Sequence, residues 1–331
     1  MDPKTFFKTI ETELSATCFL IESRVFPDED ELPKCLKCNS SMKYFIKKSG
    51  NDQKIKARCS RCFSAKSITN YNSFFCNNES ENCRVSGLNI TKILHIIYEW
   101  TDDSSVIEAM GHCKASKPTI IHWYQRCRRL LAKQWENRSK MGGQNRLVQI
   151  DECLLRGKRK NNVGRLRLGD LNAARVEDAS INSSRNYGRR LEGPWVFGLV
   201  EKLDDGALDA RFFVVEKRDA ATLESIITRE VEIGSTIHSD EWRGYLNIWD
   251  YGYHHDTVNH TVNFINPETG ANTQRIESLW TGLRLKIVKQ MRGTINLEDH
   301  LIERSWRLRR KNDDLFESFI KILGECKQCE H

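Results

Sequence analysis

Residues 146–155 read RLVQIDECLL, and this short apolar run, with an acidic residue at position 151, is the starting point for predicting the fold. Two similar runs follow it, WVFGLVEK at 195–202 and DARFFVVEK at 209–217. Each run is rich in Val, Ile, Leu or Phe, which is typical of β-strands. The sequence therefore predicts three consecutive strands.

Helical and strand-like segments alternate after these strands. The predicted segments are a helix over 219–234 with Asp219 as its N-cap, a strand over 235–242, a short helix from Trp242, a strand within 254–264 and a long helix from about Thr273 to Lys289. A strand–helix–strand crossover favours parallel pairing. The order βββαβαβα is that of an α/β ribonuclease H-like fold, with helices on the faces of one sheet.

Of the three C-x-x-C pairs in the chain, two lie close together near the N-terminus. Cys35 and Cys38 are separated from Cys59 and Cys62 by twenty residues. Four thiolates at this kind of spacing can close the tetrahedral shell of one structural Zn²⁺ ion. Strand-like runs flank the turn-forming residues 49–52, so a hairpin can bring both pairs together. The sequence predicts a small zinc ribbon over residues 31–70.

Cysteines outside these pairs are interpreted differently. Cys76 and Cys83 have a wider spacing and are expected to be ordinary thiols, and Cys326, Cys329 and His331 are expected to belong to a reduced C-terminal tail. A long chain without an export signal uses cysteine for metal ligands or buried thiols more often than for disulfides. We therefore expect a reducing compartment.

Helical patterns surround the cysteine-rich segment. Residues 1–30 predict a helical lead-in, and residues 88–140 predict a helical DNA-binding region. Within it, segments 106–115 and 117–131, joined near Pro118, fit a helix-turn-helix. Two short helices with a turn between them give the same pattern, so a helical spacer is the alternative.

The charge balance points towards polyanions. Formal net charge is +7, and basic residues cluster as RGKRK at 156–160 and RLRR at 307–310. Such runs suit nucleic acid, although solvated surface is the alternative. No stretch of 18 apolar residues and no signal-peptide core is visible. We expect no membrane partner, and we expect the nucleus in a eukaryote and the cytoplasm otherwise.

Three carboxylates occupy positions where α/β sheets place functional groups. Asp151 is expected to end the strand that contains LVQI, Asp240 to end the strand that contains STIHS, and Glu277 lies in the first turns of the helix from Thr273. Clustered carboxylates repel one another and need cations, and Mg²⁺ prefers such oxygen ligands. Two ions about 4 Å apart can clamp the attacking and leaving oxygens of phosphoryl transfer. Nearby Glu152, Glu241 and Asp170 are expected to be surface charges or helix caps.

Four motifs carry a family resemblance: IDE at 150–152, SDEWRGY at 239–245, VNH at 258–260 and TGANTQRIESLW at 269–280. Through them, roughly residues 30–295 resemble the Merlin transposases and the allied bacterial insertion-sequence transposases of the DDE type. The resemblance implies a catalytic triad of Asp151, Asp240 and Glu277, with Mg²⁺ or Mn²⁺ as cofactor. It also implies that double-stranded DNA, both the inverted repeats and the target, is the substrate.

The resemblance also suggests domain limits and one departure. Residues 145–295 would form the catalytic domain, and 296–331 a C-terminal helix and tail. The family usually has His where this chain has Asn272, which puts catalytic activity in question. His260 and Trp242 match the motifs and could contact DNA or support the site; we favour support.

A basic insertion separates the first two predicted strands. Its residues Lys158, Arg159, Lys160, Arg165 and Arg167 are expected to contact DNA phosphates from a flap. A nuclear-import signal is an alternative that is compatible with this role.

The sequence as a whole predicts a DNA transposase that cleaves transposon ends and joins 3′-hydroxyl strands to target DNA, working as a homodimer or larger assembly. One alternative is a domesticated DNA-binding protein that cuts no strand. Another is a zinc-ribbon nuclease unrelated to transposition.

Overall fold

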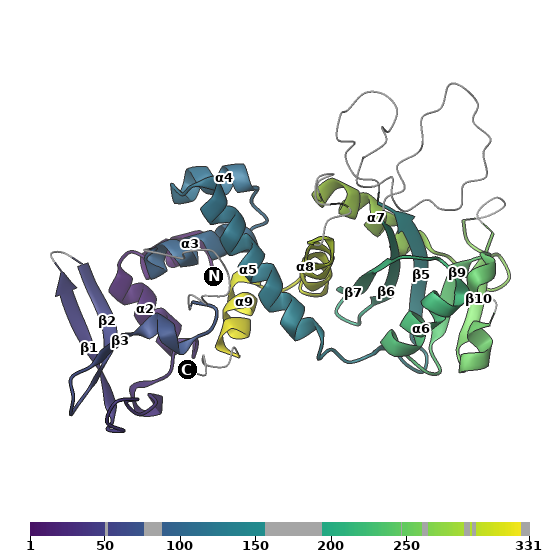
Figure 1. Ribbon diagram of the computed structural model, residues 1–331. Coiled ribbons are helices and arrows are strands. Elements are labelled where there is room, and N and C mark those ends of the chain that lie inside the picture. The colour runs from purple at the N-terminus through teal and green to yellow at the C-terminus, as the bar shows by residue number, and fades with distance from the viewer. Residues whose placement is uncertain are drawn as a thin grey trace, which may run out of the picture. The chain divides into compact units, whose positions relative to one another are not determined.

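The computed structural model describes residues 1–49, 52–75, 88–155, 194–245, 247–259, 264–287, 292 and 296–325. It divides into two compact units (Figure 1). Met1–Leu130 and Asn312–His331 form the N-terminal unit, and Leu131–Lys311 forms the sheet unit. Among the described residues, no helix combines the length and the apolar character that crossing a bilayer requires.

Five strands form the central sheet of the sheet unit: β5 (Leu147–Leu154), β6 (Trp195–Lys202), β7 (Leu208–Val215), β9 (Thr236–Asp240) and β10 (His254–Val258). They lie side by side in the order β10-β9-β5-β6-β7 (Figure 1). β5, β6 and β7 pair antiparallel, whereas β9 pairs parallel with both β5 and β10. This order confirms the predicted ribonuclease H-like fold.

Helices cover both faces of the sheet: α6 (Ala220–Glu230) on one, α7 (Gln274–Lys286) and α8 (Leu297–Arg309) on the other. Side chains of a strand alternate between faces. Val148 and Ile150 therefore join the apolar core under α6, while Cys153 joins the core under α7 and α8. Asp151 lies two residues before Cys153 on β5, so its side chain is on the same face of the sheet, which α7 covers.

Local signals in the sheet unit are largely confirmed. The side chain of Asp219 accepts the backbone N–H of Thr222 at the start of α6, as its predicted capping role requires. The predicted helix from Trp242 is instead two 3₁₀ turns, η3 (Arg243–Tyr245) and η4 (Ile248–Tyr251), and the last strand ends at Val258. Gly252, with φ of 83°, ends η4 in the left-handed conformation.

The position of Asp151 needs a correction. It lies inside β5 instead of at its end, because β6 continues to pair with β5 from Asp151↔Gly198 to Leu154↔Trp195. Pairing of β5 with β9 stops earlier, at Gln149↔His238. Asp151 is therefore the second residue beyond the point where β5 and β9 separate.

The N-terminal unit begins with helices and contains the predicted hairpin. Strands β1 (Met42–Ser49) and β2 (Asp52–Cys59) pair antiparallel with Met42 opposite Cys59, and β3 (Ala65–Ser67) adds to β2. The helical elements of this unit are α1 (Pro3–Thr9), α2 (Glu13–Glu22), η1 (Glu29–Glu31), η2 (Ile68–Tyr71), α3 (Ile90–Thr101), α4 (Val106–Cys113), the first part of α5 (Lys117–Trp135) and α9 (Leu315–Gly324).

Aromatic rings hold the helices of this unit together. Phe6 of α1 stacks on Tyr98 of α3 with ring centroids 4.0 Å apart, and Phe316 of α9 lies 5.1 Å from Phe6. The ring centroids of Trp100 and Phe319 are 4.9 Å apart. The segment in which we expected one C-terminal helix thus contains two: α8 packs on the sheet, and α9 packs in the aromatic core of the N-terminal unit.

The predicted helix pair at 106–131 is present. α4 has a capping box between Ser105 and Glu108, and it ends at Lys114 in the left-handed conformation. α5 then begins at Lys117, with Pro118 in its first turn. Whether this pair binds DNA or acts as a spacer stays a prediction.

Candidate active site and metal centre

The three predicted carboxylates lie near enough to interact electrostatically, at the end of the sheet where β5 and β9 separate. The pKa of partly buried Asp151 is raised to about 6, first by burial and then by the negative charges of Asp240 and Glu277. β5 and β9 position the two aspartates, and the first turn of α7 carries Glu277. Such mutual repulsion makes this end of the sheet a favourable place for cations.

A donor from the protein orients each carboxylate. The indole Nε1 of Trp280 donates to Oδ2 of Asp151 at 2.8 Å. The backbone N–H of Trp242 donates to Oδ1 of Asp240 at 3.1 Å, and the Thr273 hydroxyl donates to Oε1 of Glu277 at 2.6 Å. Trp242 thus contacts Asp240 through its backbone, and the choice between DNA contact and support for its side chain stays a prediction.

The spacing of these carboxylates limits how they could bind metal. Among the described residues, they do not form a group whose ligand atoms all lie within 4.8 Å of one another. Oxygen ligands of a single Mg²⁺ ion lie about 2.1 Å from it, and so at most about 4.2 Å apart. One ion could not contact all three carboxylates without side-chain movement.

Gln149 is a positioning residue that the sequence analysis missed. Its side chain is 1% exposed on β5, and its Oε1 accepts the backbone N–H groups of Arg275 and Ile276 at 3.0 and 3.3 Å. It thus provides an acceptor for backbone N–H groups at the N-terminus of α7, which have no partner within the helix. Because Gln149 is two residues from Asp151, it ties the helix of Glu277 to the strand of Asp151. A polar residue inside an apolar strand was the available signal.

Asn272, the departure from the family pattern, takes part in the same link. Its Oδ1 accepts from Nε2 of Gln149 at 2.8 Å, and its backbone N–H donates to Nδ1 of His238 at 3.3 Å. Its amide also donates to the Gly270 carbonyl at 3.1 Å. Asn272 therefore has a structural place beside the carboxylates, in the loop that leads into α7.

Gly198 makes room for the indole that holds Asp151. It lies opposite Asp151 on β6, and a Cβ atom added there would be 2.5 Å from the ring of Trp280. We expect Gly198→Ala to lower the free energy of unfolding by about 1–3 kcal/mol, the usual cost of overpacking. Urea denaturation measures this loss.

The matched control is Gly282→Ala on α7, where no atom lies within 4 Å of the added Cβ. Because alanine is the better helix former, this variant should be unchanged or more stable by about 0.5–1 kcal/mol. Equal stability of Gly198→Ala and the wild type would show that Trp280 is not tightly held.

Glu152 is not the surface charge that we expected. Its side chain is 4% exposed, it accepts a hydrogen bond from the Tyr245 hydroxyl, and Arg218 lies 4.0 Å away. Burial, together with the charges of Asp151 and Asp240, raises its pKa to about 7. Glu241 is exposed and accepts from the Asn259 amide at 2.7 Å.

The two cysteine pairs meet as predicted. The Sγ atoms of Cys35, Cys38, Cys59 and Cys62 lie within 4.8 Å of one another. Cys35 and Cys62 are 3.5 Å apart, and Cys38 and Cys59 are 3.3 Å apart. A Zn–S bond of about 2.3 Å places the sulfurs of a tetrahedral site about 3.8 Å apart, so the four thiols fit a zinc ion.

Hydrogen bonds at this centre favour the thiolate form of Cys35, whereas burial and the thiols of Cys38 and Cys62 leave the pKa of Cys59 raised. The backbone N–H groups of Arg61 and Cys62 both point to Sγ of Cys59 at 3.4 Å. A hydrogen bond with the Ser64 hydroxyl, aided by backbone N–H groups, lowers the pKa of Cys35 to about 6. Thiolate is the form that binds a metal ion.

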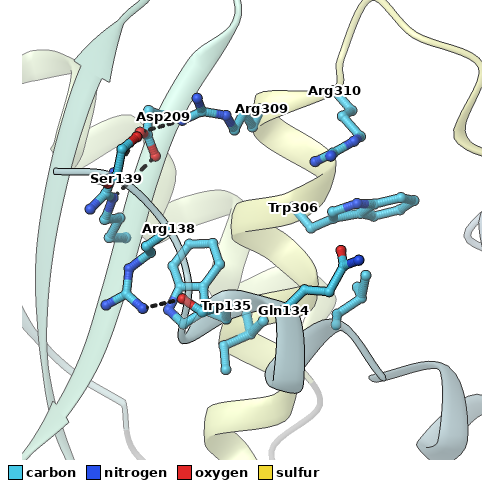
Figure 2. Close-up of a pocket in the computed structure, with 11 residues that line it drawn as sticks. Gln134, Trp135, Arg138, Ser139, Asp209, Trp306, Arg309 and Arg310 are labelled. Carbon is cyan, nitrogen blue, oxygen red and sulfur yellow. Dashed lines mark hydrogen bonds and ion pairs between the residues drawn. The ribbon is translucent and has the colours of Figure 1, made fainter. Parts of the chain in front are cut away.

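A separate cavity of about 210 Å³ lies between the C-terminal part of α5, β7 and α8 (Figure 2). Three of the arginines that line it are held by ion pairs: Arg211 bonds Asp209 and Glu230 at 2.9 Å each, Arg138 bonds Glu230 at 2.5 Å, and Arg309 bonds Asp209. Helices α5 and α8 both end here, and the C-terminus of a helix favours nearby cations. We interpret this network as structural.

Several predicted residues lie outside the described part of the chain. These are the basic residues of the insertion, Lys158, Arg159, Lys160, Arg165 and Arg167, together with Asp170, His260, Cys76, Cys83, Cys326, Cys329 and His331. Their expected roles stay predictions.

Comparison with known proteins places the carboxylates in a recognised domain. Residues 145–301 match the ISXO2-like transposase domain, which agrees with the resemblance to insertion-sequence transposases. No curated protein matches the chain.

Solved structures give distant likenesses. A Mos1 transposase paired-end complex with the left transposon end has 10% identity and a TM-score of 0.28, over 76% of this chain and 80% of that one. The Mos1 strand transfer complex has 10% identity and a TM-score of 0.26, over 76% and 79% of the two chains. At these values the likeness carries no conclusion about this chain.

Proposed function

We propose that this protein cleaves transposon ends and joins the 3′-hydroxyl strands to target DNA, because residues 145–301 match the ISXO2-like transposase domain. The observation that supports it best is that Trp280 of α7, the helix that carries Glu277, donates a hydrogen bond to Asp151 of β5, where the charges of Asp240 and Glu277 also act. The substrate would be double-stranded DNA, both the inverted repeats and the target.

Asp151, Asp240 and Glu277 would hold two Mg²⁺ or Mn²⁺ ions. When bound, such ions supply a more acidic water and charge stabilisation for the attacking and leaving oxygens. The protein's own contribution is orientation: Trp280, Trp242 and Thr273 fix the carboxylates, and Gln149 fixes the start of α7. Pre-set ligands of this kind avoid reorganisation during the reaction.

Two further parts belong to the proposal. Cys35, Cys38, Cys59 and Cys62 would hold one structural Zn²⁺ ion that stabilises the ribbon. The helices at 88–140 and the basic insertion would bind the transposon end, and joining two ends requires at least a dimer. We propose domain limits of 31–70 for the ribbon and 145–295 for the catalytic domain.

Magnesium affinity should depend on pH. Metal binding needs ionised carboxylates, and the pKa of Asp151 without metal is about 6. Affinity should therefore rise about fivefold from pH 5 to pH 6 and about tenfold from pH 5 to pH 7, and level off above pH 7. Isothermal titration calorimetry with Mg²⁺ measures this. The dependence should weaken in Asp151→Asn and persist in Asp250→Asn, and an affinity independent of pH in the wild type would contradict the expected role of Asp151.

The proposed function is tested with DNA that carries the inverted repeats flanking the gene. Mg²⁺-dependent cleavage, followed by joining of a pre-cleaved end to a second duplex, is expected. Cleavage without joining would instead favour a zinc-ribbon nuclease, and tight binding without cleavage would favour a domesticated DNA-binding protein.

A further inference from the structure

Arg218 is held between two tryptophans in the segment that links β7 to α6. Its guanidinium carbon lies 3.7 Å from the ring centroid of Trp195 and 5.5 Å from that of Trp242. Cation–π contacts of this kind keep an arginine in one place. The side chain is nevertheless 37% exposed. Arg218 is therefore a fixed cation that solvent, or a ligand, can reach.

The surroundings place Arg218 at the carboxylate edge. Its Nη1 is 4.0 Å from Oε2 of Glu152, the neighbour of Asp151 on β5. Trp242, its second aromatic partner, donates its backbone N–H to Asp240. Glu152 lies at the outer limit of an ion pair and also binds the Tyr245 hydroxyl. Glu152 therefore neutralises Arg218 only in part.

A DNA strand that approaches this edge meets several negative charges. Asp151, Glu152 and Asp240 act on one another electrostatically, and each would repel a phosphate. A cation fixed beside them offsets that repulsion. Stacking on an indole leaves the N–H groups in the guanidinium plane available, and these can bind a phosphate through two parallel hydrogen bonds.

Resting on the proposed function, we infer that Arg218, held by Trp195 and Trp242, binds a backbone phosphate of the DNA strand that lies at Asp151 and Asp240. Arg218 is then a positioning residue: it fixes the path of the strand relative to the carboxylates. Phosphate contacts of this kind set register without reading sequence.

Helix α6 offers a matched control at its other end. Arg229 also lies over an aromatic ring, 5.1 Å from the centroid of Phe213. Its Nε bonds Oε1 of Glu230 at 2.8 Å, and its side chain is 59% exposed. Arg229 therefore resembles Arg218 in lying over an aromatic ring. It differs in having a carboxylate at bonding distance and in lying at the other end of α6, away from Asp151 and Asp240.

The test is the salt dependence of the Kd for duplex DNA that carries the inverted repeat, measured by fluorescence anisotropy in the full-length protein. Each lost phosphate contact lowers the slope of log Kd against log salt by about 0.9. We expect Arg218→Gln to lower the slope by that amount and to weaken binding about tenfold or more. Arg218→Lys should keep the slope, and Arg229→Gln should match the wild type.

Thermal melting of each variant separates binding from folding. A wild-type slope in a folded Arg218→Gln protein would overturn the inference, as would an equal loss in Arg229→Gln. Cleavage of the same DNA by the wild type reports on the proposed function independently. If the wild type cleaves and the Arg218→Gln slope is unchanged, the inference about Arg218 is wrong and the proposed function stands. If the wild type does not cleave and the Arg218→Gln slope is reduced, the proposed function is wrong and the phosphate contact stands.

Discussion

Replacing Asp240 with Asn is expected to abolish cleavage of transposon-end DNA while leaving DNA binding intact. The change keeps the size of the side chain and removes the charge that a divalent cation needs. Metal-assisted phosphoryl transfer derives several kcal/mol of transition-state stabilisation from such a cation, and each 1.36 kcal/mol is a factor of ten. We therefore expect the cleavage rate to fall about a thousandfold or more, measured by gel assay with Mg²⁺.

The adjacent Glu241 provides the control. It is exposed and bonds the Asn259 amide, so Glu241→Gln should cleave at nearly the wild-type rate. Full cleavage by Asp240→Asn would remove Asp240 from the proposed triad. If neither the wild type nor the variant cleaves, but both bind the ends tightly, the domesticated DNA-binding function becomes the better explanation.

The second large effect is expected from Cys59→Ser. Four thiols converge here, and binding of a structural zinc ion contributes about 10–16 kcal/mol in small zinc domains. A hydroxyl is a poor substitute for a buried thiolate. We expect zinc content to fall from one ion per chain to none and residues 31–70 to unfold, measured by elemental analysis and by proteolysis of the ribbon.

Cys18→Ser is the matched control, because Cys18 lies on α2 and outside the four-thiol group. It should keep one zinc ion and an intact ribbon. A Cys59→Ser protein with full zinc content, or a wild type that retains its ribbon after complete chelation, would show that the thiols are not a structural zinc site. This test measures zinc content and proteolysis, so its result does not depend on whether the protein cleaves DNA.

Local patterns in the sequence were sufficient for much of the architecture. The apolar runs at 147–154, 195–202 and 208–215 are strands because their side chains alternate between two buried faces, and Asp219 caps α6 through a bond to a residue three positions away. The two C-x-x-C pairs indicated the four-thiol cluster because each pair is itself a local turn. The choice of Asp151, Asp240 and Glu277 came from the family resemblance and stays a prediction.

Contacts between distant residues could not be predicted in this way. Gln149 caps α7 across more than a hundred residues of chain, and Gly198 accommodates Trp280 from another element. Glu152 was expected to be exposed because a carboxylate next to a strand residue usually is; its burial depends on Tyr245 and Arg218.

The sequence by itself therefore determined most of the strands and helices and the pairing of the cysteines, since these depend on spacing and on neighbouring residues. Only the tertiary structure decided that Gln149 links two elements of the site, that Arg218 is fixed between Trp195 and Trp242, and that α8 and α9 pack in different units. The physical reason is that burial, pKa and ion pairing depend on which surfaces meet in three dimensions, and residue order alone does not specify those surfaces.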